Sequence, residues 1–281
     1  MDLTAVVNVG DNVWINGVYV CPDIDIATYT LAGVADAERG WGIQGDTYEV
    51  LEAVSRLGGD AWFRLGDLDL ATCLLRTDML RKGATLTQAT DRIRKGFRVR
   101  SAILPATDGS VETWLRTSKG RLHLQEFWVR EGGRPRVEAV TYRGARRASA
   151  TTEVKSAIAA ADRIVVCPAN PVTSIRPMLA LPGFPGLLAK SRARAVALSP
   201  MAGRAPYSGP AGKLLKATGV RPDSVGVAEL YSEFIDAIMI SDEDSAMKGA
   251  IEGGGVECAL SDTVMTDREA ESRVAKELLR L

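Results

Sequence analysis

The sequence predicts an α/β protein built on a doubly wound parallel sheet with an α+β insertion, and three observations lead to this fold class. From residue 152 onward, helical segments alternate with short apolar strands, as in parallel sheets covered by helices on both faces. Between residues 99 and 142 the pattern changes to a period of two with glycine and proline turns, which indicates an antiparallel meander. The 281 residues are 46% hydrophobic, enough to bury one large core or two smaller ones.

The N-terminal region is expected to begin with a strand that leads into an acidic turn. VVNVGDN, residues 6–12, has three valines before Asp11, and the hairpin-like VWINGVYV follows it. Helices are then predicted, each closed by a glycine, over 46–57, 70–81 and 87–95. Asp46 and Glu49 have the spacing of a capping box for the first of these helices.

The C-terminal region supplies the parallel sheet. Strands are predicted over residues 163–167, 193–199, 234–240 and 256–260, and helices over 152–161, after Ser174, after Pro210, after Ser224 and at the C-terminus. Thr266 and Glu269 are expected to cap the last helix. Ligands of doubly wound sheets bind at the carboxyl ends of the strands, so the loops that follow these strands are the candidate site.

Charge and composition exclude several classes of function. Thirty-five basic residues balance thirty-five acidic ones, so we expect small molecules as partners and neither nucleic acid nor a membrane. No signal peptide or apolar run of membrane-spanning length is present, which favours the cytoplasm. The four cysteines form no CxxC pair, which argues against a zinc site or a redox dithiol. His123 is the single histidine and is expected to be structural, since it lies in a period-two strand pattern.

Two loops at the carboxyl ends of predicted strands suit an anionic ligand. In the first, two prolines flank Asn170, and Thr173 and Ser174 can cap a helix whose amides would face the ligand. The second is rich in glycine and proline and ends at Gly212 and Lys213, which could wrap phosphate oxygens. Phosphate binding and ordinary loop and cap chemistry are equally open on this pattern.

The second loop is not a Walker A motif. That motif needs a glycine where Tyr207 stands, and Leu214 replaces the serine or threonine that would hold magnesium.

Three short acidic segments each place carboxylates after a turn: GDN (10–12), PDID (22–25) and GDLD (66–69). Hard oxygen ligands of this kind suit a magnesium ion that bridges a polyphosphate. The alternative is that they are helix caps and turn formers. The carboxylates in question are Asp11, Asp23, Asp25, Asp67 and Asp69.

Several long motifs identify a family by resemblance. VVNVGDNVWINGVYVCPDIDIATYTLAG, GWGIQGDTYEVLEAV, WFRLGDLDLATCLLRT, LQEFWVR, NPVTSI and SGPAGKLL, in this order, resemble the 2-phospho-L-lactate transferase family of deazaflavin coenzyme biosynthesis over essentially the whole chain. The resemblance implies a Rossmann-like nucleotide-binding domain formed by residues 1–30 and 151–281. It also implies that the insertion, residues 31–150, shapes the deazaflavin site, and that the protein is a homodimer as in its relatives.

The resemblance further implies a magnesium-dependent transferase. Family members move a 2-phospholactyl or phosphoenolpyruvyl unit from a guanosine diphosphate-linked donor to the ribityl hydroxyl of the deazaflavin Fo and release GMP. Phosphoryl transfer depends on positioning and charge neutralisation, which carboxylate-bound magnesium and backbone amides can supply without a histidine. Whether lactate or enolpyruvate is carried stays open.

The site residues follow from matching this chain to the family's motifs. Asp25 and Arg64 resemble residues that contact Fo. We expect Asp11 to bind magnesium, with Asp25 either sharing the metal or accepting the hydroxyl proton, so that both are candidate catalytic residues. The remaining expected substrate-binding residues are Asp67 and Asp69, together with Asn170, Thr173, Ser174, Gly212 and Lys213 on the guanosine diphosphate side.

The chain also departs from the family's pattern. Asn12 stands where the family usually has a second aspartate, and Leu68 replaces an arginine. Chains of the family begin with a further strand and a GGTG-type loop ahead of VVNVGDN, expected to cradle the diphosphate. On this comparison the first strand of the sheet is predicted to be truncated, with weak or no activity.

Three alternatives follow. The chain could be a nucleotide-sugar-binding regulator on the same scaffold, resembling the gluconeogenesis factors, or an inactive fragment of the transferase. An NAD-dependent enzyme is disfavoured because no GxGxxG follows a strand.

Overall fold

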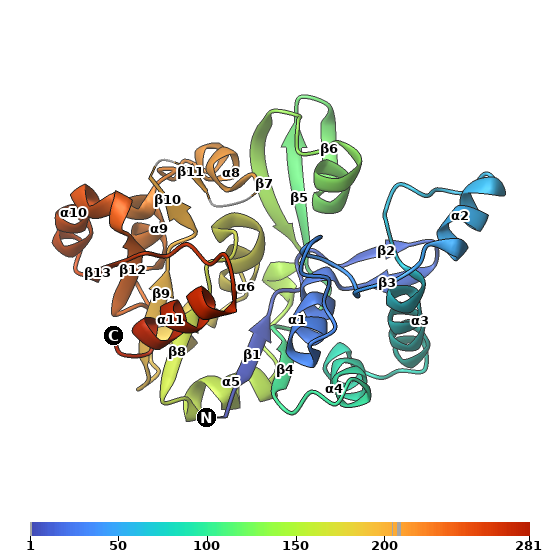
Figure 1. Cartoon of the computed structure of the whole chain (residues 1–281), viewed down its shortest axis with the longest axis horizontal. Helices are drawn as coiled ribbons and strands as arrows, with labels where there is room; N and C mark the ends of the chain where they lie inside the picture. The colour runs from blue at the N-terminus through green and yellow to red at the C-terminus, as the bar shows by residue number, and fades with distance from the viewer. Residues whose placement is uncertain (1, 204, 207–208) are drawn as a thin grey trace.

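A four-stranded parallel sheet, ordered β13–β12–β9–β8, forms the centre of the C-terminal half of the chain (Figure 1). The computed structural model describes residues 2–203, 205–206 and 209–281. The strands are β8 (Arg163–Val166), β9 (Arg194–Leu198), β12 (Ala237–Ser241) and β13 (Glu257–Ser261). All four were predicted from the sequence, and their all-parallel pairing confirms a Rossmann-like α/β fold.

Helices cover both faces of this sheet because side chains alternate along each strand. They are α5 (Thr152–Ala160), α6 (Arg176–Leu179), α7 (Phe184–Ala189), α8 (Ala211–Ala217), α9 (Ser224–Tyr231), α10 (Lys248–Gly253) and α11 (Arg268–Leu278). Val196 and Met239 pack on α11, whereas Ala197 and Ile238 belong to the cluster that holds α8 and α9. The doubly wound arrangement is thus confirmed.

Shorter segments connect these elements on the C-terminal side. They are the π-turn η3 (Pro171–Ile175), the hairpin strands β10 (Met201–Ala202) and β11 (Ala205–Pro206), and the 3₁₀ turn η4 (Asp242–Met247). The η3 turn follows β8 and carries the first of the two predicted anion loops. In the second loop, Tyr207 lies outside the described residues.

A second parallel pair joins the start of the chain to its middle. β1 (Thr4–Val7) pairs with β4 (Ala102–Pro105), with Val6 opposite Leu104. The assignment of 102–105 to the antiparallel meander was therefore wrong. Ile103 is buried in a cluster with Val154 of α5, so apolar burial on this side decides the pairing. The domain boundaries at residues 30 and 150 stay a prediction.

Between β1 and β4 lie a hairpin and four helices. They are β2 (Val13–Ile15), β3 (Val18–Val20), α1 (Pro22–Ala32), α2 (Glu49–Arg56), α3 (Asp67–Arg81) and α4 (Leu86–Gly96). The hairpin turns at Asn16 and Gly17, which both have positive φ, as a two-residue turn requires. Figure 1 shows α1 beside the β1–β4 pair and α2 at the far edge of the molecule.

The predicted meander forms a three-stranded antiparallel sheet. Its strands are β5 (Glu112–Thr117), β6 (Gly120–His123) and β7 (Val137–Arg143), in the order β6–β5–β7. The strand predicted through LQEFWV is wrong, because residues Glu126–Arg130 form the π-turn η1. In this turn Phe127 is buried in the core and its neighbour Trp128 is exposed. A strand would give the same alternation, which is why the sequence pattern led to the wrong prediction. A short 3₁₀ turn, η2 (Ala145–Arg147), leads into α5.

The predicted cap at Asp46 was wrong, whereas the alternative reading of Asp67 as a helix cap is confirmed. Asp46 does not cap α2; its carboxylate accepts from the amides of Leu68 and Asp69 and so caps α3. Asp67, inside α3, accepts from the amides of Glu49 and Val50 and so caps α2. The two helix starts are therefore tied together by an exchange of aspartates.

The C-terminal helix shows the same kind of difference. The carboxylate of Asp267 accepts from the amides of Glu269 and Ala270, each at 2.9 Å, so Asp267 rather than Thr266 is the cap of α11. No helix among the described residues combines the length and apolar character needed to span a bilayer.

Candidate active site

Two acidic side chains from different elements converge on the amide of Asn8. Its Nδ2 donates to Asp11 Oδ1 at 3.0 Å and to Asp23 Oδ2 at 2.7 Å. The same nitrogen donates to the carbonyl oxygen of Thr173 in η3 at 3.1 Å. Asn8 and Asp11 are buried. The structure thus brings together the acidic turn after β1, the first turn of α1 and the loop after β8.

The turn that carries Asp11 is fixed by close packing. Asn8 Oδ1 accepts from the amide of Gly10 at 2.8 Å, and the Gly10 carbonyl accepts from the amide of Thr113 in β5 at 2.7 Å. A Cβ at Gly10 would lie 2.8 Å from both Thr113 Oγ1 and Pro177 Cβ. Only glycine therefore fits between β5 and α6, which explains the GD sequence of this turn.

The two carboxylates lie in an environment that disfavours their charge. Burial raises the pKa of Asp11 well above its usual range, Asp23 raises it further, and the bond from Asn8 opposes both. Burial also raises the pKa of Asp23, again opposed by Asn8. Within the described part of the chain, no lysine or arginine forms an ion pair with either residue. Two converging carboxylates, Asp11 buried and Asp23 half-buried, without a basic partner suit a hard divalent cation such as Mg²⁺.

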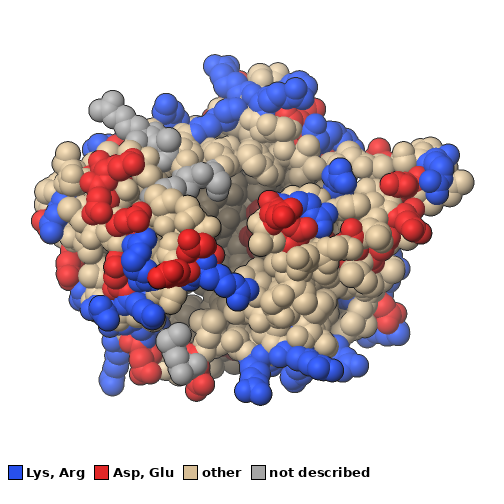
Figure 2. Space-filling model, viewed as in Figure 1, with Lys and Arg blue, Asp and Glu red and all other residues tan. Residues whose placement is uncertain are grey.

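Figure 2 shows a groove on one face of the molecule, between the half that carries β8–β13 and the half that carries α1–α4. Acidic side chains lie at its rim and set back inside it. The face therefore offers a hollow lined in part by negative charge, as a site for a cation-bound phosphate requires.

Asp25, which the sequence analysis expected beside Asp11, faces another direction. Its carboxylate forms an ion pair with Arg76 of α3, and Arg76 is completely buried. Because α1 begins at Pro22, Asp23 and Asp25 are two residues apart in a helix and point to opposite sides of it. Asp23 is consequently the residue that sequence reasoning missed as the partner of Asp11. The proline at the start of α1 was the signal that could have identified it.

A second polar cluster surrounds Asp25. The oxygen of Tyr29 donates to Asp69 Oδ1 at 2.6 Å, and the ligand atoms of Asp25, Asp69 and Cys73 lie within 4.8 Å of one another. The guanidinium of Arg76 already supplies positive charge at this point. This cluster is therefore less suited to a cation than the pair formed by Asp11 and Asp23.

Asp69→Asn is expected to stabilise the protein at neutral pH. Burial, with Asp25 nearby, raises the pKa of Asp69 to about 6. Ionised Asp69 therefore costs stability as the pH rises from about 4 to 6, and the cost is full above that range, up to about 3 kcal/mol. Asparagine keeps an acceptor for Tyr29 without the charge. Urea unfolding should show the variant more stable than the parent at pH 7.5 and equal to it at pH 4; an equal difference at both values would contradict the prediction.

The other residues expected at the Fo side lie around the exchange of helix caps. The carboxylate of Asp67 accepts from two backbone amides of α2 and from Thr47 Oγ1 at 2.6 Å, so it has a structural role as a cap. These bonds lower its pKa. Arg64 is exposed, and its guanidinium lies 4.6 Å from the ring centre of Tyr48. Arg39 stacks near the ring of Trp41 at 5.2 Å in the same loop.

Of the residues expected on the guanosine diphosphate side, those in η3 lie closest to the carboxylate pair. Asn170 Oδ1 accepts from the amides of Val172 and Thr173 at 3.0 and 3.3 Å and so caps this turn. The amide of Ser174 donates to the backbone carbonyl of Asn170. Since the Thr173 carbonyl contacts Asn8, this predicted anion loop and the acidic turn belong to one site.

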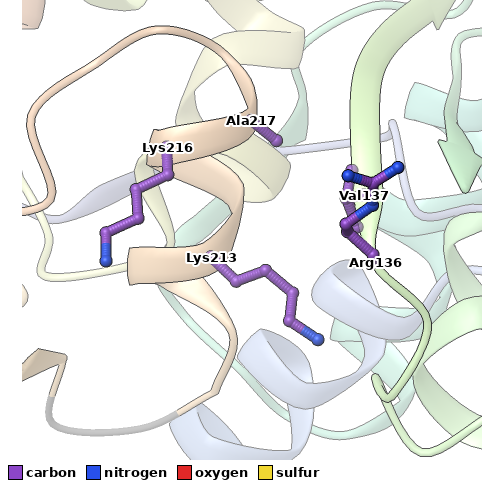
Figure 3. A pocket seen from close by; sticks show the side chains of 5 residues that line it. All are labelled: Arg136, Val137, Lys213, Lys216 and Ala217. Carbon is purple, nitrogen blue, oxygen red and sulfur yellow. The ribbon is translucent and has the colours of Figure 1, made fainter.

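Gly212 and Lys213 lie in the first turn of α8, at the base of the second predicted loop. The Lys213 ammonium donates to the carbonyls of Gly133, Arg134 and Pro135 at 2.7, 3.2 and 3.3 Å. Figure 3 shows its side chain extending from α8 towards β7, in a pocket lined also by Arg136, Val137, Lys216 and Ala217. Lys213 thus ties α8 to the segment that precedes β7.

His123 is buried in β6, as its strand pattern predicted. Its Nδ1 accepts from the amide of Gln125 at 3.2 Å, and burial lowers its pKa. The side chain of Gln125 in turn donates to the carbonyl of Asp11 at 3.4 Å. His123 therefore supports the acidic turn, through Gln125 and through the backbone of Asn12.

Comparison with known proteins identifies the family to which the chain belongs. The family described as 2-phospho-L-lactate transferase CofD matches residues 1–277. The chain is 38% identical over 275 residues to the 2-phospho-L-lactate transferase of Methanosarcina mazei, covering 98% of the chain and 90% of that protein. It is 39% identical over 257 residues to the phosphoenolpyruvate transferase of Mycobacterium leprae, covering 87% and 77%.

A solved structure, protein BH3568 from Bacillus halodurans, superimposes with a TM-score of 0.62 at 18% identity and covers 99% of this chain and 91% of that one. At that identity the likeness shows a shared fold alone. The match to the family model and to the curated relatives over nearly the full chain goes further. The chain belongs to the 2-phospho-L-lactate transferase CofD family and is a transferase.

Proposed function

We propose that the protein transfers a 2-phospholactyl or phosphoenolpyruvyl unit from a guanosine diphosphate-linked donor to the ribityl hydroxyl of the deazaflavin Fo and releases GMP. The observation that carries this proposal is the convergence of Asp11 and Asp23 on Asn8, beside Thr173. It supplies a cation site next to a loop suited to phosphate, which is what transfer from a diphosphate needs. The names of the relatives, one a lactate and one an enolpyruvate transferase, support the donor class.

The reaction needs little covalent help from the protein. The hydroxyl oxygen of Fo attacks the phosphorus that bears the organic acid, the bond from that phosphorus to the bridging oxygen of the diphosphate breaks, and GMP leaves with that oxygen. The hydroxyl proton is lost to a base. A bound Mg²⁺ would neutralise charge on the diphosphate oxygens.

The residues of this chain then have separate tasks. Asp11 and Asp23 would hold the cation. The turn η3 lies beside this pair on the expected phosphate side, and its amides donate to the side chain and carbonyl of Asn170, which fixes the shape of the turn. Asp25 is held by Arg76, and acceptance of the hydroxyl proton by Asp25 remains the proposal made from the sequence. The homodimer and the cytoplasmic location also stay predictions.

The test is a product analysis. The 281-residue chain is incubated with Fo, the guanosine diphosphate-linked lactate and Mg²⁺, and GMP and phospholactylated Fo are sought by mass spectrometry, which also registers slow turnover. We expect both products in equal amounts, and the enolpyruvyl donor in a parallel reaction decides which acid is carried. Binding of the donor without either product would favour the nucleotide-binding regulator instead.

A further inference from the structure

We propose, on the basis of the proposed function, that Asn8 is the positioning residue of the metal pair: its single amide sets the separation of Asp11 and Asp23 and fastens both to the donor-side turn η3. One nitrogen lies within hydrogen-bond distance of three oxygens that come from three elements, and its two hydrogens are shared among them. Both carboxylates accept from this nitrogen, so its removal takes away the group that holds their side chains at a fixed separation.

The orientation of the Asn8 amide is fixed by its own partners. Its oxygen accepts from the amide of Gly10, which only the oxygen end can do, so the NH₂ group must face Asp11 and Asp23. Asn8 is therefore not expected to be a cation ligand itself. It would instead orient the two carboxylates by hydrogen bonds, as residues that contact metal ligands but not the metal commonly do.

The third bond links the metal pair to the donor side. The Thr173 carbonyl that accepts from Asn8 belongs to the turn capped by Asn170, and the neighbouring Val172 carbonyl accepts from the hydroxyl of Tyr142 in β7 at 2.6 Å. Residues 8 and 173 are thus joined although they are 165 positions apart in the chain. A displacement of Asn8 would shift the carboxylate pair relative to η3. Because the reaction depends on the positions of its groups, such a shift is expected to slow it strongly.

The decisive variant is Asn8→Ser. A serine hydroxyl can still accept from the amide of Gly10 and keep the turn, but it is too short to bridge the two carboxylates. Asn8→Ala removes both functions and serves as the second variant. The matched control is Thr151→Ala, which removes the buried cap of α5, where Thr151 Oγ1 accepts from the amide of Val154, far along the chain from the site.

The probe is Mn²⁺ alone, with free Mn²⁺ followed by electron paramagnetic resonance in titrations of each variant. We expect Asn8→Ser and Asn8→Ala to weaken Mn²⁺ binding by about 10- to 100-fold, the usual effect of losing an outer-sphere partner. We expect Thr151→Ala to bind Mn²⁺ as the parent does while its melting temperature falls. In steady-state assays, the Asn8 variants should lose kcat more than they raise the KM for Fo.

Asp11→Asn is measured in parallel to separate two kinds of failure. If Asp11→Asn weakens Mn²⁺ binding but Asn8→Ser does not, the positioning role of Asn8 is wrong and the metal pair stands. If Asp11→Asn leaves Mn²⁺ binding unchanged, the metal pair itself is wrong. Equal weakening in Thr151→Ala would show general destabilisation and would also overturn the role of Asn8.

Discussion

Asp23→Asn is expected to lower kcat by at least about 100-fold without loss of stability. A bound metal ion provides several kcal/mol of charge stabilisation in the transition state, and this substitution removes one of the two protein ligands proposed for it. Asparagine has the same shape and can still accept from Asn8 Nδ2. Because burial raises the pKa of Asp23, the loss of its charge should not cost folding free energy. The measurement is steady-state turnover with the melting temperature recorded on the same sample.

The matched comparison for this variant is Asp23→Glu, which keeps the charge but moves it by one methylene. We expect Asp23→Glu to retain more activity than Asp23→Asn, with the loss relieved in part at high Mg²⁺. Full turnover of a folded Asp23→Asn protein would show that the residue is no metal ligand. A large fall in its melting temperature would show instead that it is a structural residue.

Arg76→Met is expected to destabilise the fold by about 3–5 kcal/mol, the usual cost of removing one partner of a buried ion pair. Arg76 is completely buried and pairs with Asp25, which is 4% exposed. It also donates to the carbonyl of Tyr19 at 3.0 Å, so the substitution leaves a buried carboxylate and a carbonyl without a charged donor. Urea denaturation monitored by circular dichroism gives the free energy of unfolding.

A second substitution shows whether the charge is the cause. In the double variant Arg76→Met with Asp25→Asn, no buried charge remains without a partner, so most of the lost stability should return. A single Arg76→Met variant within about 1 kcal/mol of the parent would contradict the prediction, since that is the range of exposed ion pairs.

The strands of the parallel sheet could be predicted because each is recognisable from its own short stretch of sequence. β9 and β12 are buried on both faces, so each appears as an uninterrupted apolar run between helices. β4 has the same apolar character but precedes the meander, and nothing in its own residues reveals that its partner is β1. The helices that Asp46 and Asp67 cap could not be predicted for the same reason. Each aspartate caps a helix of another segment, so the local sequence shows no capping spacing.

The candidate site was predictable to a similar degree. The sequence analysis named Asp11, Asn170 and Thr173, which the structure brings near one another, because acidic turns and proline-flanked loops at strand ends are visible in the sequence. Asn8 was not, because its importance comes from bonds to three separate elements that only the fold brings together. The choice of Asp25 over Asp23 arose because both fit the motif, and only the direction of each side chain from α1 separates them.

The most direct measurement of the central claim is an anomalous difference map from crystals of this protein soaked in Mn²⁺. We expect one strong peak between the carboxylates of Asp11 and Asp23, within about 2.0–2.6 Å of an oxygen of each. A peak among Asp25, Asp69 and Cys73 instead, or no peak beside Asp11 at saturating Mn²⁺, would contradict the assignment of this pair as the metal site.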